Sequence, residues 1–111
     1  MAARYELFKG VNGQFYFRLI AGNGEQILQS EGYVSKQGAQ NGINSVRVNS
    51  PLDSRYERKE SLNHQYYFVL RSGGNWEVIG VSETYTTPNA RETGIASVKA
   101  NGPVAPIIDL T

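Results

Sequence analysis

The stretch GINSVRVNSP, from Gly42 to Pro51, recurs as GIASVKANGP from Gly94 to Pro103. A ten-residue phrase that occurs twice in a chain of 111 residues indicates an internal repeat. The residues around the two copies match as well, and the matched pairs include Tyr5 with Tyr56, Leu19 with Leu70, and Ile27 with Ile79. The spacing of the last pair is one residue longer, so the sequence predicts two tandem repeats with an inserted residue near Asn75 and Trp76.

Each copy of the phrase is typical of a helix end. Small and apolar residues recur with helical spacing over residues 35–48 and 87–100, which predicts two helices. Ser35 and Thr87 are candidate N-caps, and Pro88 suits the first helical position. Asn49 and Asn101 are candidate left-handed caps at the C-terminal ends.

A glycine occupies the same place in both predicted helices, at Gly42 and Gly94. Glycine costs a helix about 1 kcal/mol relative to alanine. Its presence twice predicts that a strand passes each helix too closely to admit a Cβ.

Alternating apolar and polar residues precede each helix and are interrupted by Gly and Asn. A two-residue loop at Asn12-Gly13 would place Leu7 opposite Arg18. A three-residue loop ending on a left-handed Gly13 instead places apolar residues opposite one another and Glu6 opposite Arg18, and we prefer this register. His64 takes the place of Gly13 in the second repeat. The predicted strands are 4–9, 15–21, 25–31, 55–60, 66–71 and 77–83.

The C-terminal segment PIIDLT follows the second helix at the distance at which Arg55 to Glu57 follow the first. We therefore expect residues 104–111 to form a strand that pairs beside the first repeat. The predicted organisation is a single domain over residues 1–111, with repeats at 4–52 and 55–103 that share one core.

The combined pattern of Phe17-Arg18-Leu19, Ile27, Ser30-Glu31-Gly32-Tyr33 and Gly42 to Asn49, present in both halves, resembles the YegP-like proteins, a bacterial family of short tandem domains. The resemblance covers nearly the whole chain. It implies an α+β fold in which two β3-α units form one antiparallel sheet, with both helices on one face and a pseudo-twofold axis. It also implies that the strand after each helix is exchanged into the other unit. It implies no activity.

Charge and composition favour no particular class of partner. The chain has 11 Lys and Arg against 10 Asp and Glu, which gives a formal net charge of +1. It has no Cys and no apolar run long enough to cross a bilayer. We expect a cytoplasmic protein without disulfides that does not enter a membrane and that is a monomeric pseudo-dimer.

Catalytic signatures are absent from the sequence. His64 is the single His, and neither a G-x-S-x-G nor an S-x-x-K motif occurs. Glu31 and Glu83 lie in paired SE-x-Y segments, but no local spacing places a second carboxylate beside either of them. We predict no enzymatic activity, no cofactor and no metal.

One surface is a candidate binding site. Strand alternation sends aromatic and basic side chains to the sheet face opposite the helices, foremost Tyr16, Arg18, Tyr67 and Arg71. We interpret this face as the contact surface of a protein-interaction module. The alternative is single-stranded RNA or DNA, whose bases stack on such aromatics. A third class, an enzyme with an unrecognised site, has the least support.

Overall fold

The computed structural model describes residues 2–111. It contains two α-helices, one short 3-10 helix and seven strands in the order expected of two repeats. The first repeat comprises β1 (Arg4–Lys9), β2 (Phe15–Ile20), β3 (Gln26–Gln29) and α1 (Lys36–Asn49). The 3-10 helix η1 (Asp53–Arg55), β4 (Tyr56–Glu60), β5 (Tyr66–Arg71), β6 (Val78–Val81), α2 (Pro88–Asn101) and β7 (Ile107–Asp109) follow.

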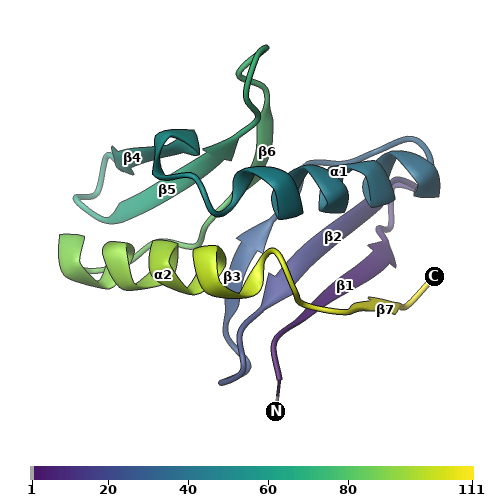
Figure 1. The fold of residues 1–111 in the computed structure, drawn as a ribbon, viewed down its shortest axis with the longest axis horizontal. Coiled ribbons are helices and arrows are strands. Elements are labelled where there is room, and N and C mark those ends of the chain that lie inside the picture. The colour runs from purple at the N-terminus through teal and green to yellow at the C-terminus, as the bar shows by residue number, and fades with distance from the viewer. Residues whose placement is uncertain (1) are drawn as a thin grey trace.

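All seven strands form one sheet in the order β4-β5-β6-β3-β2-β1-β7, and both helices cover the same face of it (Figure 1). The α+β class, the exchanged C-terminal strand and its place beside β1 are therefore confirmed. The sheet is antiparallel, as expected, except at one edge, where β7 pairs with β1 in parallel. The chain reaches β1 by crossing over from α2, and such a crossover returns it in the same direction as β1.

The hairpin of β1 and β2 has the register preferred from the sequence. Tyr5 lies opposite Leu19 and Glu6 opposite Arg18. Gly13 has φ +81°, and His64, its counterpart in the second hairpin, has φ 62°. Both residues therefore adopt the left-handed conformation that a three-residue loop of this type requires.

Both helices begin as expected. The Ser35 and Thr87 side chains accept hydrogen bonds from the backbone N–H groups of Gly38 and Ala90. The expectation for the C-terminal ends was wrong, because Asn49 and Asn101 remain helical. Their Nδ2 atoms donate to the carbonyl oxygens of Ser45 and Ser97, one turn back.

Gly42 and Gly94 face tyrosine side chains. A Cβ on Gly42 would lie 2.5 Å from the hydroxyl oxygen of Tyr33 and 2.7 Å from the ring of Phe17 on β2. A Cβ on Gly94 would lie 2.3 Å from the hydroxyl oxygen of Tyr85. The close approach is thus real, but tyrosine rings lying between helix and sheet impose it more than the strands do.

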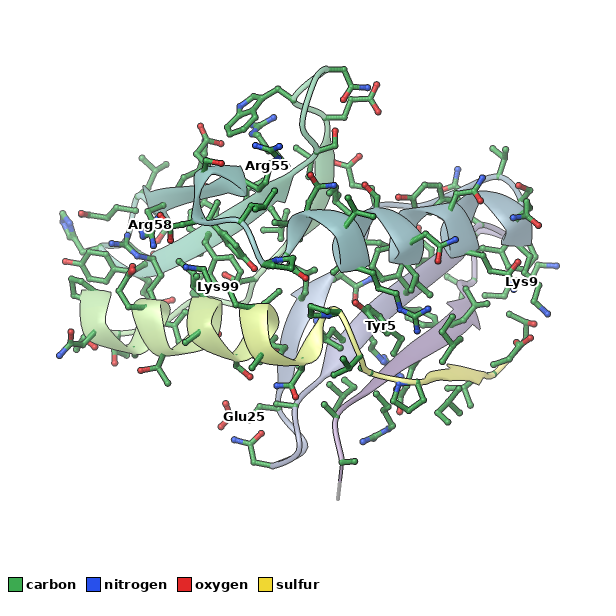
Figure 2. All side chains as sticks on the ribbon, viewed as in Figure 1. Tyr5, Lys9, Glu25, Arg55, Arg58 and Lys99 are labelled. Carbon is green, nitrogen blue, oxygen red and sulfur yellow. The ribbon has the colours of Figure 1, made fainter. Side chains whose placement is uncertain are left out.

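The repeats interlock through two buried tyrosines. Tyr5 on β1 donates its hydroxyl to the carbonyl of Gly102 at the end of α2, at 2.6 Å. Tyr56 on β4 donates to the carbonyl of Ser50 at the end of α1, at 2.7 Å. Figure 2 shows Tyr5 between the end of α2 and β7. Burial raises the pKa of both phenols, so both remain protonated donors.

The pseudo-twofold axis passes between β3 and β6, where Gln29 pairs with Val81. The side chains nearest the axis are unequal. A Cβ on Gly80 would lie 2.7 Å from Cγ of Leu28, and a Cβ on Gly102 would lie 2.5 Å from Oγ of Ser50. At both equivalent pairs, one repeat supplies a side chain and the other supplies the space for it.

Candidate functional site

The sheet face opposite the helices carries the four residues predicted as a binding surface. The register places Arg18 beside Glu6, Tyr16 beside Phe8, Tyr67 beside Lys59, and Arg71 beside Val78. All four predicted residues are half-buried. We call this surface the open face, because no helix lies over it (Figure 1).

In the first repeat, the open face is a stack of aromatic and basic groups. The Tyr16 ring stacks on Phe8 with centroids 5.6 Å apart, and the Arg18 guanidinium lies 4.6 Å from the centroid of Phe8. Arg18 also donates from Nε to Glu6 at 2.8 Å. This hydrogen bond, with a further one from Arg4, lowers the pKa of Glu6. The Glu6 carboxylate thus pairs with both Arg18 and Arg4.

In the second repeat, Arg71 is held at several points. Its Nε donates to Glu57 at 3.0 Å, its Nη1 donates to the carbonyl of Trp76 at 2.9 Å, and its guanidinium lies 5.7 Å from the Trp76 ring centroid. Trp76, beside the predicted insertion, has φ 58° and is partly exposed. Left-handed backbone in so bulky a residue costs about 1–3 kcal/mol. Arg71 stabilises this turn.

The four residues form two separate pairs. The strands β3 and β6 lie between β2 and β5. Adjacent strands are about 4.8 Å apart, so Tyr16 and Tyr67 are separated by at least about 14 Å. A ligand that contacted both tyrosines would have to span the middle of the sheet, where Gln29 and Val81 meet.

The paired SE-x-Y segments have a structural role. Ser30 Oγ accepts a hydrogen bond from the N–H of Phe17 and donates to the carbonyl of Glu31, and it thereby ends β3. Ser82 does the same with Phe68 and Glu83. Their side chains replace ladder hydrogen bonds, which explains why β3 and β6 are shorter than predicted.

The remaining titratable groups show no arrangement typical of catalysis within the part of the chain that the structure describes. His64 lies at an exposed turn, with Nδ1 at 3.2 Å from Glu60. No cluster of three or more His, Asp or Glu that could hold a metal ion occurs among residues 2–111. No helix within that range is long and apolar enough to cross a membrane.

Two clefts, which sequence reasoning missed, lie between a helix of one repeat and the strand-connecting turn of the other. The α1 cleft, of about 790 Å³, lies between α1 and the turn from β5 to β6, and its lining includes Asn41, Asn44, Ser45, Arg55, Asn75 and Glu77. The α2 cleft, of about 380 Å³, lies between α2 and the turn from β2 to β3, and its lining includes Asn23, Glu25, Tyr85, Thr93 and Ser97. The repeat alignment makes Glu25 the counterpart of Glu77, and Ser97 that of Ser45. One feature of the sequence indicated the α1 cleft, namely the residue inserted near Asn75 and Trp76, in the turn from β5 to β6.

Comparison with known proteins gives the chain's relatives. The model of a domain of unknown function, DUF1508, matches twice, at residues 11–57 and 62–109. The UPF0339 protein YegP of Yersinia pestis is 53% identical over 96% of this chain and 95% of its own length. YegP of Escherichia coli K12 is 52% identical over the full length of both chains.

Two solution structures have the same fold. The structure of UPF0339 protein SO3888 from Shewanella oneidensis superposes with a TM-score of 0.93, at 49% identity, and the match covers 100% of this chain and 93% of that one. The structure of the E. coli protein of unknown function yegP gives a TM-score of 0.93 at 52% identity, covering 100% and 95%.

Proposed function

This chain belongs to the YegP (UPF0339) family of two-repeat domains, whose matched members carry no named activity, and we propose that it is a protein-interaction module without catalytic function. The observation that supports this proposal most is the open face. Tyr16 and Tyr67 are half-buried there, on a sheet surface that no helix covers. Aromatic side chains at such positions are typical anchors of protein interfaces.

The charges of the open face favour a protein over a polyanion. Arg18 is paired with Glu6, and Arg71 with Glu57. A nucleic acid would have to compete with these carboxylates for the guanidinium groups, and phosphate contacts supply most of the affinity for nucleic acids. A protein surface with apolar side chains and a few carboxylates would instead fit around the existing ion pairs.

Single-stranded nucleic acid is the second candidate. The stack of Phe8, Tyr16 and Arg18 offers an aromatic surface next to a cation, which is the combination that stacks unpaired bases.

The cytoplasmic location, the monomeric state and the absence of a cofactor stay predictions.

The test is photo-crosslinking from positions 16 and 67. A photoreactive phenylalanine is placed at Tyr16 or Tyr67 and, as a control, at the exposed Val104 after α2. We expect protein adducts from positions 16 and 67 that survive nuclease and are absent from position 104. Adducts that contain RNA or DNA and disappear with nuclease would favour the second candidate, and equal labelling from all three positions would contradict both.

The crosslinked partner is then purified and its affinity measured. The double variant Tyr16→Ala with Tyr67→Ala should bind at least about 30-fold more weakly, because anchor residues of this kind typically cost about 2 kcal/mol or more. Val34→Ala with Val104→Ala, two exposed residues outside the open face, should bind as the wild type does.

A further inference from the structure

The α1 cleft contains a guanidinium that is held by hydrogen bonds and makes no ion pair within residues 2–111. Arg55 donates from Nε to Asn49 Oδ1 at 3.0 Å and from Nη1 to Ser54 Oγ at 3.1 Å. Asn49 is buried, and the same Oδ1 accepts from the N–H of Gly73 at 3.1 Å. These bonds orient Arg55 between the end of α1 and the hairpin of β5 and β6 (Figure 2).

Arg55 differs from most other cations of the chain. Arg18, Arg58 and Arg71 each pair with a carboxylate, whereas Arg55 makes no ion pair with any residue from 2 to 111. A Cβ on Gly73 would lie 2.6 Å from Arg55 Nη2, so the glycine lets the guanidinium lie against the turn. Nη2 donates to no residue in the described range. A bound carboxylate would find this donor already positioned.

A carboxylate lines the same cleft as Arg55. Glu77 lines the cleft, and its carboxylate makes no ion pair within residues 2–111. Burial, and then the carboxylates of Glu31 and Glu77, raise the pKa of Tyr33, whose ring lies against Gly42. Asn41 and Asn49 both line the cleft, which therefore runs along two turns of α1, and Arg55 contacts its Asn49 end. These two residues are about 12 Å apart along the helix axis.

Neutral hydrogen-bonding groups line the space between the two charges. Asn44 is exposed, and its amide has no partner in the described part of the chain. Asn75 uses Oδ1 to accept from Ser72, which leaves its Nδ2 group for a ligand. Ser45 and Asn41 line the same wall. Amides and hydroxyls in such a row suit the N–H and C=O groups of a peptide.

We propose that the α1 cleft binds a short peptide of about three residues, with its C-terminal carboxylate on Arg55 and its N-terminal ammonium on Glu77. An extended chain advances about 3.3 Å per residue, so three residues fill about 10 Å of the length of the cleft. The side-chain amides of Asn44 and Asn75 pair with the peptide backbone. This site lies on the helix side of the sheet, goes beyond the proposed function and does not depend on it.

The α2 cleft provides an internal control for peptide binding to the α1 cleft. Glu25 takes the place of Glu77 there, but Thr93 replaces Asn41 and Ala96 replaces Asn44. The counterpart of Arg55 is Arg4, which donates to Glu6. The α2 cleft therefore offers the negative charge without the fixed cation, and a zwitterionic peptide should not bind in it.

The test is a titration of the ¹⁵N-labelled protein with trialanine, followed by backbone amide shifts. We expect saturable shifts at Ser45, Gly73 and Asn75 in the millimolar range. N-acetyl-trialanine and trialanine amide should each bind about tenfold more weakly, since each lacks one terminal charge. The equivalent residues of the α2 cleft should not shift.

Two variants link each end of the peptide to one residue. In Glu77→Gln, acetylation of the peptide should no longer weaken binding, and in Arg55→Gln, amidation should no longer do so. Glu25→Gln should bind trialanine as the wild type does. Glu77 is exposed, so Glu77→Gln keeps the test valid even where Arg55→Gln perturbs the turn.

Three results would overturn the proposal. They are the absence of saturable shifts at the α1 cleft, equal affinity for the free and the end-blocked peptides, and an undiminished effect of acetylation in Glu77→Gln. Loss of trialanine binding in the double variant Tyr16→Ala with Tyr67→Ala would also contradict it, because those residues lie on the open face.

Discussion

The strands β1 and β4 occupy equivalent places in the two repeats, but another strand pairs with the outer side of β1 and none pairs with that of β4. Leu7 on β1 is fully buried, with Asp109 of β7 as its neighbour on the outer side. Its counterpart on β4, Arg58, is exposed and donates to Glu92 and Asp53. In Figure 2, Arg58 and Lys99 lie between β4 and α2.

Near the start of β1 and of β4, a backbone N–H group donates to a carbonyl oxygen, and a different element supplies that oxygen in each case. The N–H of Tyr5 donates to the carbonyl of Pro106, just before β7. The N–H of Tyr56 donates to the carbonyl of Asp53 in η1. Hydrogen bonds from Arg58 and then Lys99 lower the pKa of Asp53 to about 2, as those from Lys36 and Thr111 do for Asp109. The single turn of 3-10 helix η1 thus gives β4 the backbone acceptor that the segment before β7 gives β1.

The comparison shows that the covering element decides which residue type an edge position accepts. Under β7, position 7 is removed from water and takes leucine. At the uncovered edge, position 58 takes a charged residue, and charged residues on edge strands also discourage pairing with other chains.

Deletion of residues 105–111 would remove β7 and should have the largest effect. It exposes Leu7 and removes Ala105 and Ile107 from the core, which should lower the free energy of unfolding by about 4–6 kcal/mol. Urea denaturation measures the loss. Deletion of residues 110–111 alone is the control and should cost about 1 kcal/mol through the hydrogen bond from Leu110 to Leu7. An unchanged midpoint after the longer deletion would show that β7 does not protect β1.

Exchange of the residue types at positions 7 and 58 should have unequal effects. Leu7→Arg buries an unpaired charge and should cost about 3–5 kcal/mol in urea denaturation. Arg58→Leu removes exposed ion pairs and should change stability by no more than about 0.5 kcal/mol. Similar losses for both variants would mean that the two edges are energetically equivalent, against the comparison above.

The pair at the pseudo-twofold axis should show a smaller effect. Gly80→Ala places a Cβ against Leu28 and should cost about 1–3 kcal/mol. In the background of Leu28→Ala the same substitution should cost less, and a double-mutant cycle measures the difference. Combination with Leu110→Ala, on the far edge, should be additive. Additivity with Leu28→Ala as well would show that the two side chains do not compete for space.

Much of the fold could be predicted from local patterns. Apolar periodicity, caps and turn residues are local properties, so they predicted both helices, the register at Glu6 and Arg18, and the left-handed Gly13. The chain direction of β7 and the state of Asn49 were missed. Neither is a local property. The direction of β7 depends on its pairing with β1, and Asn49 accepts hydrogen bonds from Arg55 and Gly73.

For the candidate sites, too, the sequence predicted local features and missed those that depend on tertiary structure. Strand alternation was sufficient to place Tyr16, Arg18, Tyr67 and Arg71 on the open face, because alternate residues of a strand point to opposite sides. It could not show that Arg18 and Arg71 are paired with Glu6 and Glu57, which depends on side-chain geometry. Nor could it show that two strands separate the tyrosines.

The sequence by itself determined the two repeats, the helix starts and the residues that face each side of the sheet, because these follow from backbone preferences and periodicity. Only the tertiary structure decided the α1 cleft, since its walls come from α1 in the first repeat and from Arg55 and the β5–β6 turn in the second. It also decided the difference between Leu7 and Arg58, because burial at an edge depends on which distant segment covers it. Leu28 and Gly80 fit together for the same reason, as their complementarity exists only once β3 and β6 are paired.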